Sequence, residues 1–290
     1  MKILITGGTG LVGRYLSEIT ESEKPVVLSR KECNITDFFS VRTIFYQIKP
    51  DVVFHLAAFT NVDLSENDPV SAFRVNVSGT NNIAFFAEKI NAHLVYLSTD
   101  FVFDGMQKQP YKEQDVPHPL SIYGKTKFEG ERIVSSMCSK YTIVRSSRIF
   151  GKNGNNFASA LPGKLLSGEK TIVTTDLVNS PTYAKDLATA LFEIAKKQSY
   201  GLLHFCNSGF CNWHEYALYI CNHLRIDTSL LVPVSIKHFH QSIAERPRFS
   251  ALDTTLFSKN FYQPRPWQKA LEEYLEHEVL KRNTNMIMKQ

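Results

Sequence analysis

A glycine-rich turn near the N-terminus constrains the fold of this chain more than any other sequence feature. The run Gly7-Gly8-Thr9-Gly10-Leu11-Val12-Gly13 directly follows an apolar stretch and precedes an amphipathic one. Glycine lacks a Cβ atom, so the backbone can turn tightly and approach a pyrophosphate, while the following helix presents free N–H groups to the anion. This context predicts a Rossmann fold whose dinucleotide is contacted by Gly7, Thr9, Gly10, Leu11, Val12 and Gly13.

The first half of the chain alternates short β-branched runs with longer amphipathic stretches. This alternation is typical of a parallel sheet covered by helices on both faces. We expect strands at 2–6, 26–28, 52–56, 93–97 and 141–145, and helices at 11–23, 37–48, 69–89 and 123–138. The sequence therefore predicts an α/β protein with a doubly wound parallel sheet, in which residues 1–150 form the NAD(P)-binding Rossmann domain.

The regular alternation fades after Phe150. Residues 151–156 are a polar glycine and asparagine cluster, and residues 230–266 mix prolines with arginines. We therefore expect 151–290 to form largely a smaller substrate-binding region. Short returns of the first pattern at 171–173 and 186–196 suggest that the chain crosses back into the main sheet near 171–200, so that the two parts are interleaved. Residues 281–290 have the composition of a frayed polar tail.

Composition and charge exclude several classes of protein. The chain has 290 residues and a formal net charge of +5, but its basic residues are scattered, which does not favour nucleic-acid binding. A mildly basic surface does favour anionic small molecules such as nucleotide sugars. The chain has no apolar run long enough for a membrane helix and no signal peptide, so we expect a cytoplasmic protein without membrane contact. Its odd number of cysteines, without a Cys-x-x-Cys pair, favours free thiols: Cys33, Cys138, Cys206, Cys211 and Cys221.

The end of the second expected strand bears on the choice of cofactor. An NAD site commonly places an acidic residue there, whereas this chain has Ser29, Arg30 and Lys31. Two cations and a hydroxyl suit a 2′-phosphate, so Ser29 and Arg30 are expected to contact the cofactor and NADPH is favoured over NADH. Glu32 is close enough to support NADH instead, and the cations can also be plain loop charges.

Tyr123 and Lys127 are four residues apart in a stretch with helical spacing, so both project from one face of the expected helix. They follow Thr99 and Asp100 at the end of an expected strand, where ligands of open α/β sheets bind. A free phenol has a pKa of about 10, which a neighbouring ammonium and a positive nicotinamide ring would lower. We therefore predict that Lys127 tunes Tyr123 for proton exchange, that Thr99 binds the substrate oxygen, and that Asp100 orients the sugar or relays a proton. The alternative is a half-buried helix tyrosine beside a surface lysine.

Two other groups of residues suggest chemistry less strongly. His204, Cys206, Cys211 and His214 are close in sequence, but their spacing is not that of a structural zinc site. A strand at 202–205, a loop and a helix beginning near Trp213 account for them better. His55 ends an apolar strand and is expected to be packed or cofactor-adjacent and not a base.

Beyond the glycine turn, several motifs together resemble one family. From Lys2 to about Asp253 the chain is similar to the dTDP-4-dehydrorhamnose reductases, which are extended short-chain dehydrogenases/reductases. The spacing Gly7-x-x-Gly10-x-x-Gly13 is the extended form. The other matching segments are His55-Leu56-Ala57-Ala58-Phe59-Thr60, Val75-Asn76, Ser98-Thr99-Asp100-Phe101-Val102-Phe103-Asp104-Gly105, Tyr123-Gly124-Lys125-Thr126-Lys127, Asn156-Phe157, Pro181-Thr182 and Arg246-Pro247-Arg248-Phe249-Ser250-Ala251-Leu252-Asp253.

The resemblance implies an oxidoreductase of deoxysugar biosynthesis. NADPH would reduce a nucleotide-linked 4-keto-6-deoxy sugar, such as dTDP-4-dehydrorhamnose to dTDP-rhamnose, with Tyr123 as proton donor. The implied catalytic residues are Thr99, Tyr123 and Lys127, of which the last two also contact the cofactor. Further cofactor contacts are implied for Ala57, Ala58 and Asn76, and substrate contacts for Thr60, Thr99, Asp100 and Asn156.

At two positions this chain departs from the family pattern, and these departures limit which of the family's site residues can be assigned to it. The family has Arg-Thr-Ser-Trp after the fifth strand, with the tryptophan lining the sugar site, whereas this chain has Arg145-Ser146-Ser147-Arg148. Arg148 is therefore a candidate substrate contact that leaves the exact sugar open. Some members dimerise through magnesium, so a homodimer is one expectation, but Tyr15 replaces the glutamate that helps to hold the metal. We expect no metal.

Two other functions remain open on sequence alone. A sugar-nucleotide epimerase or dehydratase shares the Tyr-x3-Lys pattern but recycles tightly bound NAD. The regulatory beta subunit of methionine adenosyltransferase, which this family also resembles, keeps the fold without catalysis. Thr99, Tyr123 and Lys127 are all present, which favours an enzyme.

Overall fold

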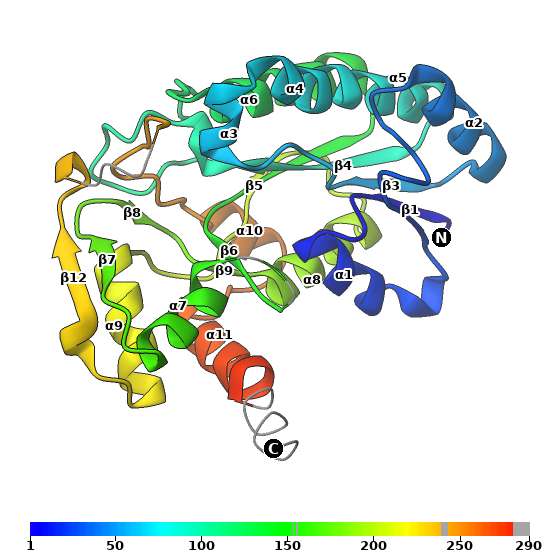
Figure 1. Cartoon of the computed structure of the whole chain (residues 1–290). Helices are drawn as coiled ribbons and strands as arrows, with labels where there is room; N and C mark the ends of the chain where they lie inside the picture. The colour runs from blue at the N-terminus through cyan, green and yellow to red at the C-terminus, as the bar shows by residue number, and fades with distance from the viewer. Residues whose placement is uncertain (153, 155, 239–242, 281–290) are drawn as a thin grey trace.

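The computed structural model describes residues 1–152, 154, 156–238 and 243–280. Its centre is a six-stranded sheet in which all pairings are parallel (Figure 1). The first five expected strands all belong to this sheet. In order across the sheet the strands are β10 (Gly201–His204), β5 (Tyr141–Ser146), β4 (His93–Thr99), β3 (Val52–His55), β1 (Ile3–Thr6) and β2 (Val26–Leu28).

Helices cover both faces of the sheet, which confirms the doubly wound prediction. Alternate residues of β1 point to opposite faces, so Ile3 and Ile5 join one apolar cluster while Leu4 joins another. The first cluster packs under α1 (Leu11–Ile19) and α8 (Ala184–Lys196). The second packs under α2 (Phe38–Ile48), α5 (Thr80–Lys89) and α6 (Ile122–Met137), along the opposite face in Figure 1.

The helix expected at 69–89 is interrupted. It begins as α4 (Pro69–Phe73), passes through a π-helical segment, η2 (Arg74–Gly79), and continues as α5. A separate short helix, α3 (Val62–Asn67), ends before Asp68, whose side chain accepts a hydrogen bond from the Ser71 N–H and caps α4. Proline at the first position of α4 fits this start because it has no N–H to satisfy. The expected helix at 11–23 likewise ends as α1 and a 3-10 turn, η1 (Glu21–Glu23).

The second half of the chain builds a smaller region below the carboxyl edge of the sheet. It contains three two-stranded sheets, which pair β6 (Ile149–Phe150) with β9 (Thr182–Tyr183), β7 (Thr171–Thr174) with β12 (Leu231–Val234), and β8 (Val178–Asn179) with β11 (Cys211–Asn212). Its helices are α7 (Phe157–Leu166), α9 (Trp213–Leu224), α10 (Thr255–Asn260) and α11 (Trp267–Tyr274). Shorter turns are η3 (Asp100–Val102), η4 (Thr228–Leu230), η5 (Ile236–His238) and η6 (Leu275–Leu280).

One of the two expected returns to the main sheet is wrong. Residues 171–173 lie in β7, which pairs with β12 outside the main sheet. The reason is visible in β7 itself, because Ile172 is exposed and threonines flank it, whereas inner strands of a parallel sheet are buried on both faces. Residues 186–196 lie in α8, which packs on α1, and the following β10 joins the sheet beside β5. In the part of the chain that the structure describes, no helix could span a membrane.

Candidate active site

A cavity of about 830 Å³ opens where the strands of the main sheet end and continues into the smaller region. It is lined both by the glycine turn and by residues of α6, α7 and α9. Of the predicted site residues, every one except Asn76 lines it: Gly7, Thr9, Gly10, Leu11, Val12, Gly13, Ser29, Arg30, Ala57, Ala58, Thr60, Thr99, Asp100, Tyr123, Lys127, Arg148 and Asn156.

The glycine turn leaves no room for side chains. Gly7 has a φ of 69°, and a Cβ atom there would lie 2.6 Å from the backbone nitrogen of Ala57. A Cβ atom at Gly13 would lie 2.5 Å from the carbonyl oxygen of Gly7. Gly10 is the N-cap of α1 and provides no side-chain hydrogen bond, so the first N–H groups of the helix remain available for an anion. These features fit the pyrophosphate of a dinucleotide.

The residues after β2 favour the 2′-phosphate of NADPH. The Glu32 carboxylate accepts a hydrogen bond from the Ser29 N–H at 2.6 Å, and hydrogen bonds from Ser29 lower the Glu32 pKa. Glu32 is thus engaged within its own turn and is not among the residues that line the cavity, whereas Ser29 and Arg30 are. The alternative in which Glu32 binds the ribose hydroxyls of NADH is therefore disfavoured. Sequence reasoning missed four further lining residues here: Cys33, Asn34, Ile35 and Thr36.

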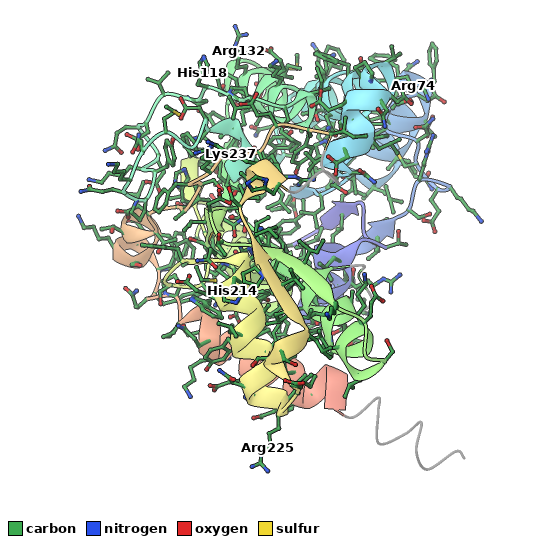
Figure 2. The ribbon with its side chains drawn as sticks, turned by 60° about the vertical axis from the view of Figure 1, so that its left-hand side comes forward. Arg74, His118, Arg132, His214, Arg225 and Lys237 are labelled. Carbon is green, nitrogen blue, oxygen red and sulfur yellow. The ribbon has the colours of Figure 1, made fainter. Side chains whose placement is uncertain are left out.

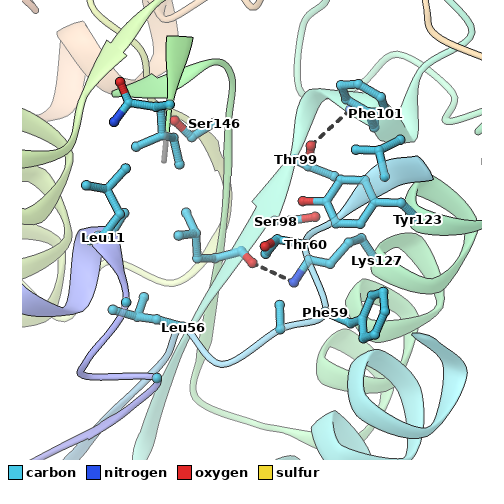
Figure 3. A pocket seen from close by; sticks show the side chains of 18 of the residues that line it. Leu11, Leu56, Phe59, Thr60, Ser98, Thr99, Phe101, Tyr123, Lys127 and Ser146 are labelled. Atoms are coloured by element: carbon cyan, nitrogen blue, oxygen red, sulfur yellow. Dashed lines mark hydrogen bonds between the residues drawn. The ribbon is translucent and has the colours of Figure 1, made fainter. Parts of the chain in front are cut away.

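Tyr123 and Thr99 meet at the middle of the cavity (Figure 3). Tyr123 lies in the first turn of α6, which begins where the Ser121 hydroxyl accepts a hydrogen bond from the Gly124 N–H. Thr99 ends β4, and its hydroxyl lowers the pKa of the Tyr123 phenol against the larger effect of burial. The Thr99 oxygen also accepts the Phe101 N–H at 3.2 Å. The two hydroxyls of the predicted group therefore belong to residues that line the same cavity.

Lys127 lies one turn further along α6 and is buried. Its Nζ donates to the Leu97 carbonyl at 2.8 Å and lies 4.0 Å from the centre of the Tyr96 ring. Burial lowers the pKa of Lys127 to about 7, against the opposing effect of the Glu131 carboxylate. The buried Lys127 amine therefore loses its proton at a lower pH than an exposed lysine does.

The predicted effect of Lys127 on Tyr123 stays a prediction, because it also includes the positive nicotinamide ring of the cofactor. Burial raises the pKa of Tyr123 to about 12, and the other groups that shift it are Thr99 and Asp100. Lys127 is instead committed to a backbone carbonyl and an aromatic ring. Desolvation of the phenol outweighs any attraction to this ammonium.

Asp100 is a buried carboxylate that accepts three hydroxyl hydrogen bonds. They come from Thr99 at 3.2 Å, Ser147 at 2.8 Å and Ser250 at 2.5 Å. Burial raises the pKa of Asp100, while these hydrogen bonds lower it. Asp100 thereby ties β4 to the residues after β5 and to Ser250 on the opposite wall, although it also lines the cavity.

Asn76 lies behind the cavity wall. Its side chain accepts the Phe59 N–H at 2.7 Å and donates to the Phe59 carbonyl and to the Thr126 hydroxyl. The expected cofactor contact is therefore replaced by a supporting one, because Asn76 fixes the loop that carries Ala57 and Ala58 against α6. Asn156 caps α7 with its side-chain oxygen and still lines the cavity.

The histidines considered from the sequence are packed. His55 is buried, with its ring nitrogens 2.8 Å from the Thr6 hydroxyl and 3.1 Å from the Thr80 hydroxyl, and burial lowers its pKa to about 3. This confirms a packing role. Burial likewise lowers the pKa of His204 to about 3, while His214 lies on α9 (Figure 2). Within the described ranges, no three His, Cys, Asp or Glu side chains are placed to hold a metal ion.

The part of the cavity that the smaller region lines contains residues that sequence reasoning missed. Arg246 and Ser250 line it, and a signal existed, since both belong to a segment that carries the family resemblance. Leu177, Asn179, Trp213 and Tyr216 also line it, from β8, α9 and the loop before β8. No sequence motif marked these four, because they reach the cavity only through tertiary packing.

Comparison with known proteins agrees with this geometry. The family model described as "RmlD substrate binding domain" matches residues 1–280. The chain is 35% identical over 285 residues to dTDP-4-dehydrorhamnose reductase of Aggregatibacter actinomycetemcomitans, covering 93% of this chain and 97% of that one. It is 34% identical over 277 residues to spore coat polysaccharide biosynthesis protein SpsK of Bacillus subtilis, covering 95% and 97%.

Solved structures give the same result. The crystal structure of dTDP-4-dehydrorhamnose reductase from Bacillus anthracis in complex with NADP superposes with a TM-score of 0.91 at 33% identity, covering 95% of this chain and 99% of that one. UDP-glucose 4-epimerase of Thermus thermophilus in complex with NAD has a TM-score of 0.80 at 18% identity, covering 96% and 99%, and shares the fold alone.

Proposed function

Because the chain belongs to the dTDP-4-dehydrorhamnose reductase family, we propose that it is an oxidoreductase that uses NADPH to reduce a nucleotide-linked 4-keto-6-deoxy sugar, such as dTDP-4-dehydrorhamnose. The observation that carries the proposal is that Thr99 and Tyr123 line a single cavity together with the glycine turn. The cavity has a glycine cradle at one end and a polar and aromatic wall at the other.

The cofactor fits the first of these ends. Gly7 and Gly13 lie so close to neighbouring backbone that only a bare Cα is accommodated, and the N-terminus of α1 offers N–H groups. The glycine turn would hold the pyrophosphate, and Arg30 with Ser29 would hold the 2′-phosphate. When bound, NADPH supplies the hydride for the carbonyl carbon.

Tyr123 supplies the proton in this proposal. A phenol with a pKa of about 12 is protonated at pH 7, which is the form needed to donate to a carbonyl oxygen that gains negative charge. The Thr99 hydroxyl, which donates to Asp100 at 3.2 Å, would turn to donate a hydrogen bond to the same oxygen and orient it. Lys127, held by the Leu97 carbonyl and the Tyr96 ring, fixes this face of α6 beside the cofactor end.

The test is a spectrophotometric measurement of NADPH oxidation with dTDP- and UDP-linked 4-keto-6-deoxy sugars. We expect one NADPH to be consumed for each sugar reduced, and no consumption without the sugar. Conversion of a nucleotide sugar without net loss of NADPH would favour the epimerase or dehydratase alternative. Tight NADPH binding with no conversion of any of these sugars would contradict the proposal and favour a regulatory protein.

A further inference from the structure

Arg148 leaves the main sheet beside the catalytic residues. The Ser146 backbone, two positions earlier, pairs with Thr99 across β4 and β5. Ser147 donates a hydrogen bond to Asp100, so the turn is tied to the residue that follows Thr99. Arg148 itself has a φ of 38°, a left-handed conformation that is uncommon for a residue with a side chain. It lines the same cavity as Tyr123.

The guanidinium of Arg148 has only weak partners. It lies 4.1 Å from the centre of the Trp213 ring and 5.3 Å from that of Tyr216, and Nη1 donates to the Cys211 sulfur at 3.5 Å. Sulfur is a weak acceptor. Nε and Nη2 are buried and have no hydrogen-bond partner among the described residues. A buried donor without a partner is costly, so two on one side chain require an explanation.

The charge of Arg148 is also uncompensated. Among the residues that the structure describes, no carboxylate forms an ion pair with it. Burial lowers its pKa, and Asp100, which has a weak opposing effect, already accepts hydrogen bonds from three hydroxyls. A guanidinium in this position gains more from an oxyanion than from a sulfur atom and two rings, because charge-assisted bidentate hydrogen bonds are stronger.

Extending the proposed function, on which this inference rests, we propose that Arg148 binds an oxyanion of the nucleotide-sugar substrate and thereby selects it. Nε and Nη2 are the two donors, and they reach the ligand when the guanidinium turns from Trp213 into the cavity. The oxyanion comes from the diphosphate or from a carboxylate on the sugar, since both match the planar donor pair. Asn179 lines the same end with a buried Oδ1 that has no described partner and can accept a hydrogen bond from a sugar hydroxyl.

A purely structural Arg148 is the competing explanation, and it makes different predictions. If the side chain served only to pack on Trp213, its loss would lower the unfolding temperature and weaken NADPH and nucleotide binding together. If it binds an oxyanion, nucleotide binding falls while NADPH binding and unfolding temperature stay near wild type. Arg148→Gln removes the charge, and Arg148→Lys keeps it while losing the paired donors.

The test is calorimetric titration of the full-length protein with dTDP, dTDP-glucose and dTDP-glucuronate, in the presence of NADP. Arg132→Gln is the matched control, since it removes the same charge from an exposed position on the outer side of α6, away from the cavity (Figure 2). The unfolding temperature and NADPH affinity are measured for each variant. Binding is read without turnover, so a failure of this inference is distinguishable from a failure of the proposed reduction.

We expect Arg148→Gln to raise at least one Kd by about tenfold or more relative to Arg132→Gln, with partial recovery in Arg148→Lys. A loss for all three ligands identifies the diphosphate as the oxyanion, and a loss confined to dTDP-glucuronate identifies a carboxylate on the sugar. The inference is overturned if all three affinities stay within twofold of wild type, if wild type binds none of the ligands, or if NADPH binding falls in parallel.

Discussion

The two ends of the cavity are built from different parts of the chain. The cofactor end consists of backbone, because Gly7 and Gly13 lie against neighbouring peptide atoms and the N-terminus of α1 supplies the donors. The sugar end consists of side chains, Arg148 and Trp213 among them, on segments far apart in the sequence. The cofactor end therefore tolerates few substitutions, whereas the sugar end can change its ligand by changing single side chains.

The junction of the two ends is expected to be the most sensitive point. Tyr123→Phe removes the proton donor and keeps the ring that packs on Phe101, so kcat should fall by about 10²- to 10⁴-fold while the Kd for NADPH changes less than about twofold. Steady-state kinetics and fluorescence titration measure the two quantities. Tyr219→Phe, whose hydroxyl bonds to Glu272 outside the cavity, is the control. A Tyr123→Phe enzyme with unchanged kcat would show that another group donates the proton.

One added methyl group should disrupt the close backbone packing at the cofactor end. Gly7→Ala places a Cβ atom 2.6 Å from the Ala57 nitrogen at a φ of 69°. We expect the free energy of unfolding to fall by about 2–4 kcal/mol and NADPH binding to weaken by about 100-fold or more.

Gly168→Ala is the control that separates the cost of steric overlap from the cost of holding alanine at a positive φ. Gly168 has a φ of 78°, but a Cβ atom there would meet nothing within 4 Å. This control should lose only about 1 kcal/mol, measured by urea unfolding, and keep NADPH affinity. Equal losses in the two variants would mean that close packing at Gly7 is unimportant.

The choice between NADPH and NADH depends on a side chain, unlike the rest of the cofactor end, which is built from backbone. Arg30→Gln should weaken NADPH binding by about tenfold and leave NADH binding unchanged, since only NADPH has the 2′-phosphate. Lys31→Gln is the control, as Lys31 is exposed and is not among the residues lining the cavity. Similar losses for both cofactors in Arg30→Gln would contradict the assignment.

Lys127 is expected to change how stability depends on pH. Its pKa is lowered to about 7 in the folded protein, against a reference value of 10.5, so between these values the unfolded chain binds more protons. The free energy of unfolding should therefore gain a component that rises with pH from about 7 towards 10, and Lys127→Met should lack it. Urea unfolding at pH 7, 8 and 9 measures the difference. Parallel pH profiles would show that Lys127 is not desolvated.

The comparison also explains which features could be predicted from the sequence. The glycine turn and the apolar strand pattern encode backbone geometry locally, so β1, β3 and the cofactor cradle followed from short segments. Asn76 and Lys127 were assigned to cavity roles by motif, but tertiary packing also gives them the Phe59 backbone and the Leu97 carbonyl as partners. The burial that raises the Tyr123 pKa cannot be read from helical spacing.

The residues of the sugar end could not be predicted from local sequence patterns. The pairing of β8 with β11 places Asn179 opposite Cys211, next to the Trp213 that packs on Arg148, and no periodicity in either short strand predicts it. The β7 strand was assigned to the wrong sheet because a four-residue apolar pattern does not identify its partner. Arg148 was noticed as a departure from a motif, and its two buried donors without partners were visible only in the folded structure.

Transfer of deuterium from NADPH labelled at the reactive nicotinamide carbon tests the central claim most directly. The account predicts one deuterium at C4 of the sugar for each NADPH consumed, detected by mass spectrometry and NMR of the product, and about 10²- to 10⁴-fold less labelled product from the Tyr123→Phe variant over the same period. Product formed with solvent hydrogen at C4, or with label retained on the cofactor, would contradict the claim that the two ends of this cavity meet in a reductase.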